Sequence, residues 1–164
     1  MCSLMKLQKS PRHSKITGDF AEGLVLYWLS KYGYECARID HVGIDLIARN
    51  PDSGERMGIS VKSRCRYDGT ENWSINLPAD GFAKASESCK TFDLIPYYAI
   101  VVDGAGSIRC FLLPMDHLVA IATGTPDGVR YWQMNDKFRK TYAIDPLIKS
   151  FELKTITNSW RDSQ

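Results

Sequence analysis

The sequence predicts an α/β protein in which helices flank a mixed central β-sheet. Two observations favour this class. Segments with helical and with strand periodicity follow one another in the order helix, strands, helix, strands, helix. The 164 residues, 44% apolar and 24% charged, are enough for one globular domain with a single core. We therefore expect a single domain over residues 17–164, preceded by a basic arm over residues 1–16.

The first helix is expected in TGDFAEGLVLYWLSKYGY, residues 17–34. Thr17 is a suitable N-cap and Gly33 a suitable C-cap. Apolar residues recur at helical spacing and predict a largely buried helix: Phe20, Ala21, Leu24, Val25, Tyr27, Trp28 and Leu29. Glu22 lies among them. A carboxylate on a mostly apolar helix needs a partner or a metal, unless it lies on the solvent side.

One or two strands are expected around Gly43 in ECARIDHVGIDLIARN, residues 35–50. Asp45 interrupts an apolar alternation there, although Asp is unfavourable in strands and burial of its charge is costly. The turn-like segment PDSGER then predicts a hairpin with GISVKSRCR, residues 58–66. Such a hairpin would bring Asp45 near Ser60 and Lys62.

The segment GISVKSRCR carries cations on one face. Strand alternation places one set of side chains on one side, Ile59, Val61 and Ser63, and another set on the other, Ser60, Lys62, Arg64 and Arg66. A row of cations predicts either an anion-binding surface or an exposed edge.

Four later segments have the periodicity of regular elements: a helix beginning near Pro78, strands over residues 96–104 and 106–114 joined by a glycine turn, and a short helix over residues 115–123. Residues 129–134 are a further strand candidate. We expect the end of the chain to cover the core with loops and a last short helix or strand.

Glu22, Asp45 and Lys62 form a candidate site. Two carboxylates can hold a hard divalent cation such as Mg²⁺, whose other positions go to water and phosphate oxygens. Such a cation polarises a phosphodiester and makes bound water more acidic, while a lysine offsets charge in the transition state. The alternative is a structural ion pair between Asp45 and Lys62. Asp19, one turn before Glu22, is a reserve ligand.

Three segments in this order resemble the PD-(D/E)XK nuclease superfamily, which has the restriction-endonuclease-like fold and includes Holliday-junction-resolvase-like proteins. GDFAEGLVLYWLSKYGY is similar to the opening helix, GIDLIA to the strand with the metal-binding aspartate, and ISVKSR to the (D/E)-x-K strand. The resemblance covers about residues 18–66. It implies a metal-dependent DNA endonuclease or resolvase-like phosphodiesterase, with Mg²⁺ or Mn²⁺ on Glu22 and Asp45 and with Lys62 as a further catalytic residue.

Ser60 departs from the family pattern, because an acid is expected at that position. A hydroxyl is a poor Mg²⁺ ligand and supplies no charge. Three outcomes are open: Glu22 supplies the missing charge, the metal is held weakly by Asp45 with a nearby carbonyl and water, or the protein is inactive and only binds nucleic acid. We favour the first, since Glu22 and Asp45 still provide two negative charges.

DNA is the expected partner, with Arg64, Arg66 and Lys84 as contacts, and a homodimer is expected because many restriction-like nucleases dimerise to cut two strands. The basic arm is either a frayed tail or a phosphate contact. NDKFRK, residues 135–140, follows Tyr131 and Trp132 and is either a second nucleic-acid contact or the edge of the core. The net charge of +2 also leaves open a protein-interaction module without a nucleic-acid role.

The five cysteines are scattered, with no CxxC pair and no metal-ligand spacing. No apolar run is long enough to span a membrane, and the first residues lack the apolar segment of a signal peptide. We therefore expect a cytoplasmic protein with reduced thiols.

Overall fold

The computed structural model of the protein describes residues 8–125 and 127–155. Within them, six strands form one sheet in the order β1-β2-β3-β5-β6-β9 and three form a small sheet in the order β4-β8-β7. The large sheet consists of β1 Glu35–His41, β2 Ile44–Arg49, β3 Arg56–Cys65, β5 Ile95–Gly104, β6 Ser107–Pro114 and β9 Lys149–Lys154. The small sheet consists of β4 Ile75–Leu77, β7 Thr123–Gly124 and β8 Arg130–Trp132.

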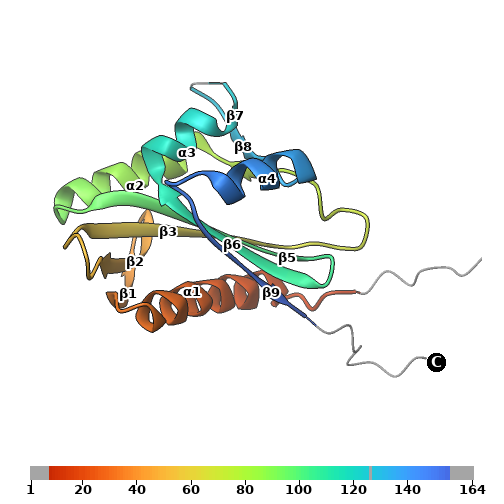
Figure 1. Ribbon diagram of the computed structural model, residues 1–164, viewed down its shortest axis with the longest axis horizontal. Helices are drawn as coiled ribbons and strands as arrows, with labels where there is room; N and C mark the ends of the chain where they lie inside the picture. The colour runs from red at the N-terminus through yellow and green to blue at the C-terminus, as the bar shows by residue number, and fades with distance from the viewer. Residues whose placement is uncertain (1–7, 126, 156–164) are drawn as a thin grey trace, which may run out of the picture.

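The helices lie on both faces of the large sheet, α1 on one and α2, α3 and α4 on the other (Figure 1). Their bounds are α1 His13–Lys31, α2 Ala79–Thr91, α3 Met115–Ile121 and α4 Asp136–Ile144. β3 and β5 are parallel while the other neighbours in the sheet are antiparallel, so the sheet is mixed. A parallel pair needs a long crossover, and here β4 and α2 supply it. The expected mixed sheet flanked by helices is confirmed.

Helix α1 begins earlier than expected. Its N-cap is Arg12 without a side-chain cap bond, and Thr17 lies inside the helix. The Thr17 hydroxyl donates to the carbonyl of His13 at 2.7 Å, which is the bond such a residue makes in a helix interior. The predicted Thr17 cap is therefore wrong, and residues 13–16 of the expected arm are helical.

The end of α1 is as predicted. Gly33 has a φ of 85°, in the left-handed region. Its N–H donates to Ser30 O and the N–H of Tyr34 donates to Leu29 O, both at 3.1 Å. These two bonds form a Schellman motif, which satisfies carbonyls at the helix end and favours glycine at this position.

The buried stripe of α1 is narrower than predicted. Ala21, Val25 and Leu29, spaced four apart, are buried against the sheet. Phe20 and Tyr27 are 47% and 58% exposed, so their predicted burial is wrong. Each lies beside the Ala21–Leu29 stripe rather than on it, and adjacent helix positions point about 100° apart.

Two turns with left-handed backbone connect neighbouring strands of the large sheet. Gly43, between β1 and β2, has a φ of 91°, and a Cβ there would lie 2.5 Å from the carbonyl of Lys84. Only glycine suits this combination of left-handed backbone and close approach to α2. At the other turn, Ala105 and Gly106 both have positive φ and join β5 to β6 as predicted.

The strand predicted over residues 129–134 is confirmed by β8, and the last part of the chain contains both a helix, α4, and a strand, β9. In the part of the chain that the structure describes, none of the helices has the length and apolar character needed to cross a membrane.

Candidate active site

The regular pairing of β2 with β3 stops where the site begins. The ladder runs from Arg49–Arg56 to Leu46–Ile59, one residue short of Asp45. There the carboxylate Oδ2 of Asp45 accepts a hydrogen bond of 2.6 Å from the backbone N–H of Val61. This bond fixes Asp45 against β3, one residue from Lys62. Lys62 lines a different cavity, together with Lys9, Arg64 and residues at the start of α1.

Glu22 and Asp45 face the same cavity. This cavity, the acid cavity, has a volume of about 450 Å³ and is lined from α1, β1 and β2 by Asp19, Glu22, Arg38, Ile39, Asp40, His41 and Asp45. The helix and the hairpin are far apart in the sequence, and the packing of α1 against the sheet brings their carboxylates together.

The charge of Glu22 is only partly balanced. Burial raises the pKa of Glu22, and the negative charge of Asp45 raises it further. Arg38 opposes this increase, with its Nε 3.3 Å from Glu22 Oε2. A cation between Glu22 and Asp45 would relieve the repulsion that raises this pKa.

The two carboxylates fit a divalent cation. Among the described residues, no group of three or more His, Cys, Asp or Glu side chains is arranged to hold a metal. Mg²⁺ does not need such a group, because it keeps several waters and binds through one or two carboxylates together with phosphate oxygens. Glu22 and Asp45 supply that donor set, and Asp45 Oδ1 lies outside the bond to Val61.

Tyr98 connects the rest of the site. It is paired with Ser60 across the parallel β3–β5 ladder, and both side chains are buried. Burial raises the pKa of the Tyr98 hydroxyl, the neighbouring Ser60 hydroxyl lowers it, and the charge of Asp45 raises it. Lys62 Nζ lies 5.9 Å from the centre of the Tyr98 ring. Ser60 is therefore buried beside Tyr98 on the neighbouring strand.

Sequence reasoning missed Tyr98, because it lies in the strongly apolar segment 96–104 and reads as a core residue. Its relation to the site follows from the register that pairs it with Ser60, and no local sequence signal gives the register of two distant parallel strands.

Lys62 is not neutralised by a structural ion pair. In residues 8–125 and 127–155, no ion pair joins Lys62 to Asp45 or to another carboxylate. The alternative interpretation, an ion pair between Asp45 and Lys62, is therefore not supported, and Asp45 instead accepts a hydrogen bond from the Val61 N–H. The ammonium group remains available to a ligand.

The three predicted DNA contacts have different surroundings. Arg64 is exposed. Arg66, which follows the end of β3, donates through Nη2 to the carbonyls of Trp73 and Ser74 at 3.2 and 2.7 Å. Lys84 pairs with Asp80 at 2.8 Å on α2. Arg64 itself donates through Nη1 to the carbonyl of its neighbour Ser63 at 2.7 Å, and Arg66 holds a loop.

Two further residues that line the acid cavity, Asp19 and His41, have partners within the chain. Asp19 lines the acid cavity and pairs with Lys15 at 3.3 Å on the helix surface. His41 lines it too, but its Nδ1 lies 3.2 Å from Ser88 Oγ and its ring packs edge-on against Phe92. His41 therefore helps to join β1 to α2.

Of the basic arm expected over residues 1–16, the structure describes residues 8–16, and Lys6 lies outside the described residues. Lys9 Nζ donates to the carbonyl of Cys65 at 2.6 Å and lies over the ring of Tyr67. This part of the arm therefore lies along the end of β3, next to Arg64 in a shared cavity.

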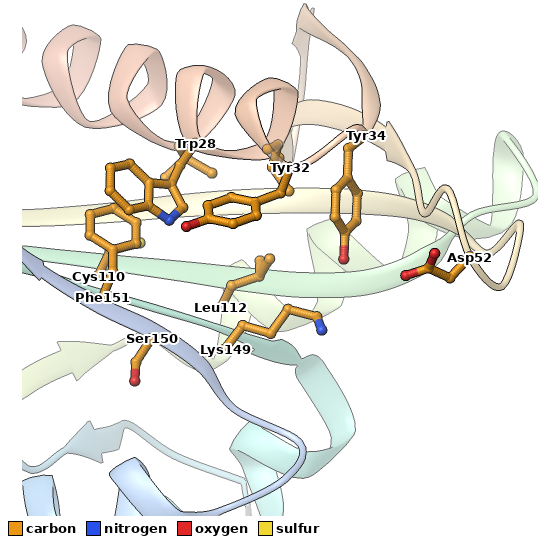
Figure 2. A pocket seen from close by; sticks show the side chains of 11 residues that line it. Trp28, Tyr32, Tyr34, Asp52, Cys110, Leu112, Lys149, Ser150 and Phe151 are labelled. Carbon is orange, nitrogen blue, oxygen red and sulfur yellow. The ribbon is translucent and has the colours of Figure 1, made fainter.

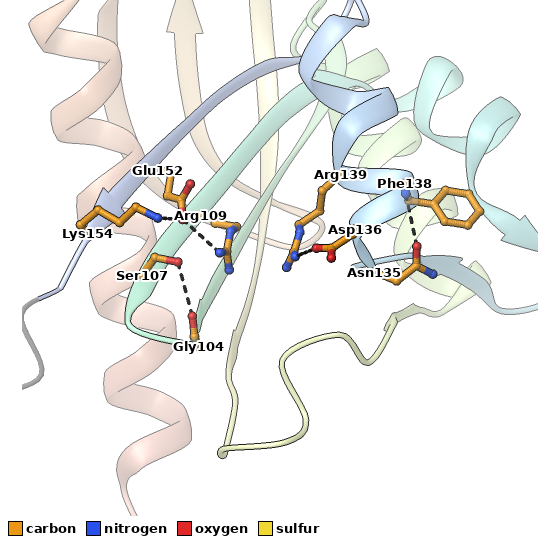
Figure 3. Close-up of polar contacts among 9 residues, drawn as sticks. All are labelled: Gly104, Ser107, Arg109, Asn135, Asp136, Phe138, Arg139, Glu152 and Lys154. Carbon is orange, nitrogen blue, oxygen red and sulfur yellow. Dashed lines mark hydrogen bonds and ion pairs between the residues drawn. The ribbon is translucent and has the colours of Figure 1, made fainter.

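The second basic cluster belongs to the edge of the core. Trp132 is fully buried and stacks on Tyr142 with ring centres 3.9 Å apart, and Phe138 packs against the same core. Arg139 pairs with Asp136 (Figure 3). The nucleic-acid interpretation of residues 135–140 gains no support from Trp132 and Phe138, which pack in the core, and Tyr131 is the exposed aromatic neighbour at 37%.

Another cavity, of about 420 Å³, lies between α1 and strands β6 and β9 (Figure 2). Trp28 and Phe151 stack there at 3.9 Å, and most of its other lining is apolar or aromatic. Asp52 is the single carboxylate of this lining, so the acid cavity is the better candidate for metal chemistry.

No family model and no curated protein matches the chain. Its fold, however, is that of restriction-endonuclease-like proteins. A solved structure of Hjc, a Holliday junction resolvase from the archaeal hyperthermophile Archaeoglobus fulgidus, superposes with a TM-score of 0.54. The match has 19% sequence identity and covers 76% of this chain and 88% of that one. At this identity the comparison establishes the fold, which confirms the restriction-endonuclease-like architecture that the sequence predicts.

Proposed function

We propose that the protein is a metal-dependent DNA endonuclease or resolvase-like phosphodiesterase. The observation that carries this proposal is the acid cavity, where Glu22 and Asp45 meet beside the Lys62 strand. The likeness to a Holliday junction resolvase supports it at the level of the fold.

Each residue has a defined task in this proposal. Glu22 and Asp45 hold Mg²⁺ or Mn²⁺, which when bound polarises the phosphodiester and acidifies a water. The Val61 N–H keeps Asp45 oriented. Lys62, free of a carboxylate partner, offsets the negative charge that develops on the phosphate. Arg64 contacts a neighbouring phosphate of the same strand.

Glu22 takes over the charge that Ser60 lacks. Ser60 is 1% exposed beside Tyr98, and we assign its hydroxyl no ligand role. The shared cavity supports this assignment, and the pKa of Glu22, raised first by burial and then by the charge of Asp45, is consistent with it.

Cleavage assays test the proposal. Plasmid and four-way-junction DNA are incubated with Mg²⁺ or Mn²⁺ and with the native protein, Asp45→Asn, Glu22→Gln or Glu87→Gln. Glu87 is exposed on α2 and provides a matched control on a helix. We expect cleavage by the native protein and by Glu87→Gln, with losses of about 100-fold or more in the two site variants. No cleavage with either metal, or full activity of Asp45→Asn, refutes the nuclease.

A second candidate function is DNA binding without cleavage. The buried Ser60 favours it, because a serine at this position means that the third strand contributes no acid to the site. In this case binding should weaken steeply with salt while no metal supports cleavage, since phosphate contacts release counterions. Salt-independent binding would reject it.

We propose a homodimer for the nuclease, because two active sites are needed to cut two strands in one encounter. Sedimentation equilibrium of the native protein measures this directly, and a monomer at all accessible concentrations contradicts it.

A further inference from the structure

The loop of residues 66–74, between β3 and β4, presents an exposed tryptophan next to the cationic strand. Trp73 is 62% exposed. Its backbone is held on both sides, because its carbonyl accepts from Arg66 Nη2 and its N–H donates to Thr70 O at 3.1 Å. Thr70 is itself bonded to Tyr67 through both its N–H and its hydroxyl. The loop is therefore built to hold this indole in place.

A polar cavity lies beside this tryptophan. It has a volume of about 430 Å³, and we refer to it as the Trp73 pocket; its lining is Arg64, Arg66, Trp73, Ser74 and Asn76. This lining contains two guanidinium groups, an amide and a hydroxyl but no carboxylate. Its chemistry suits an anion with an attached flat ring.

The two arginines of the pocket are close enough to repel each other. Burial lowers the pKa of Arg66, and the positive charge of Arg64 lowers it further. Among the described residues, neither arginine forms an ion pair with a carboxylate. A phosphate between them would offset both charges, and charge-assisted bonds from arginine are the strong contacts of phosphate recognition.

The pocket lies one step along the strand from the candidate catalytic lysine. Lys62 and Arg64 are two residues apart on β3 and share a face, which separates their Cα atoms by about 7 Å. A nucleotide in the Trp73 pocket would therefore be a near neighbour of the phosphate at Lys62.

From this arrangement we propose that the Trp73 pocket binds an unpaired nucleotide of DNA, with Arg64 on its phosphate and the Trp73 indole stacked on its base. The proposal rests on the proposed function for the identity of the ligand as DNA. The base must be unpaired because in a duplex both of its faces are covered by neighbouring bases. The pocket would make the protein prefer single-stranded or branched DNA to a continuous duplex.

Binding without cleavage tests the pocket separately from the nuclease. Asp45→Asn protein in EDTA is titrated into a labelled single-stranded oligonucleotide or its duplex, and fluorescence anisotropy reports the dissociation constants. We expect Trp73→Ala to weaken single-strand binding by about 10-fold and duplex binding by less than about 2-fold. Trp73→Phe should retain most of the affinity, since its ring still stacks.

The controls separate the alternatives. Tyr27→Ala removes an exposed aromatic ring from α1, on the other face of the sheet, and should change neither affinity. Circular dichroism checks that each variant is folded. Equal losses for single strand and duplex, or no loss in Trp73→Ala, overturn the proposal. So does thymidine monophosphate binding as tightly as the oligonucleotide, which would mark a free-nucleotide site.

Failure of the two proposals is distinguishable. If the protein binds single strands through Trp73 but cuts no DNA, the pocket proposal stands and the nuclease proposal fails. If the protein cuts DNA and Trp73→Ala leaves its affinity for single strands unchanged, the nuclease proposal stands and the pocket proposal fails.

Discussion

Two basic clusters look alike in the sequence and differ in the fold. The first is the β3 cluster, Lys62, Arg64 and Arg66, and the second is the α4 cluster, Lys137, Arg139 and Lys140. The β3 cluster faces cavities, and its aromatic neighbour Trp73 is exposed. The α4 cluster lies over aromatic residues that belong to the core, with Arg139 paired to Asp136.

The difference shows what makes a basic cluster a candidate binding surface. Both clusters have cations and aromatic rings within a few residues, so composition alone does not separate them. They differ in the tryptophan beside each, since Trp73 is 62% exposed and Trp132 is fully buried. They also differ in pairing, because Arg139 of the α4 cluster is paired with a carboxylate and, among the described residues, no cation of the β3 cluster is. Free charge and accessible rings together favour binding of nucleic acid, while paired charge and buried rings favour stability.

The two tryptophans give the largest expected contrast. Trp132→Ala should lower the free energy of unfolding by about 3–5 kcal/mol, because it leaves a cavity between Phe111 and Tyr142. Trp73→Ala should lower it by less than about 0.5 kcal/mol, since that side chain is exposed. Urea unfolding of both variants measures the difference, and similar losses would remove the distinction between the clusters.

The next contrast concerns catalysis. Lys62→Ala should reduce the cleavage rate by about 100- to 1,000-fold, because the charge that stabilises the transition state is lost. Lys137→Ala, an exposed lysine of the α4 cluster, serves as the control and should cleave at the native rate. Single-turnover assays with saturating Mg²⁺ compare them. A loss in Lys137→Ala as large as that in Lys62→Ala contradicts the assignment.

A smaller effect is expected on the salt dependence of binding. Arg64→Ala should weaken DNA binding several-fold and reduce the slope of log K against log[salt] by about one, as expected for one lost phosphate contact. Lys140→Ala should leave the slope unchanged. Titrations at several salt concentrations measure both slopes, and an unchanged slope in Arg64→Ala would exclude that contact.

The smallest expected effect is on the pKa values of two carboxyl groups, Glu22 and Asp145, which are shifted in opposite directions. Burial and Asp45 raise the pKa of Glu22, whereas a hydrogen bond from His117, 2.8 Å away, lowers that of Asp145 after α4. Asp45→Asn should bring the pKa of Glu22 down towards its usual value, and His117→Ala should bring that of Asp145 up. Carbon-detected NMR titration follows both carboxyl groups, and a shift in the reverse sense at either would contradict the geometry.

The directions of these two pKa shifts determine how each carboxyl group contributes to folding stability at different pH. Because Glu22 binds its proton more tightly in the folded state, its contribution to stability falls as the pH rises from the usual pKa of 4.5 through the raised pKa. The contribution of Asp145 is present above its usual value of 3.8 and is lost as pH falls below it. Both effects are modest, because these carboxyl groups lie close to solvent.

Much of the fold and half of the site could be predicted from local sequence. The apolar alternation around Asp45 gave strand β2, and the segment PDSGER gave its hairpin with β3. Tyr98 could not be predicted, because its partner Ser60 lies 38 positions earlier in the chain and only the β3–β5 register joins them. Phe20 and Tyr27 were predicted to be buried because they fit the helical spacing, whereas the sheet covers the narrower face that contains Ala21.

The sequence by itself determined the order of the helices and main strands up to about residue 123, the turns at Gly33 and Gly43, and the presence of two acids and a lysine in a nuclease-like order. These depend on interactions between near neighbours along the chain, which the residue types specify directly. Only the tertiary structure decided that Glu22 and Asp45 share a cavity, that Ser60 is buried beside Tyr98 and that Trp73 is exposed. Those outcomes depend on which surfaces pack together, and packing is a property of the whole fold.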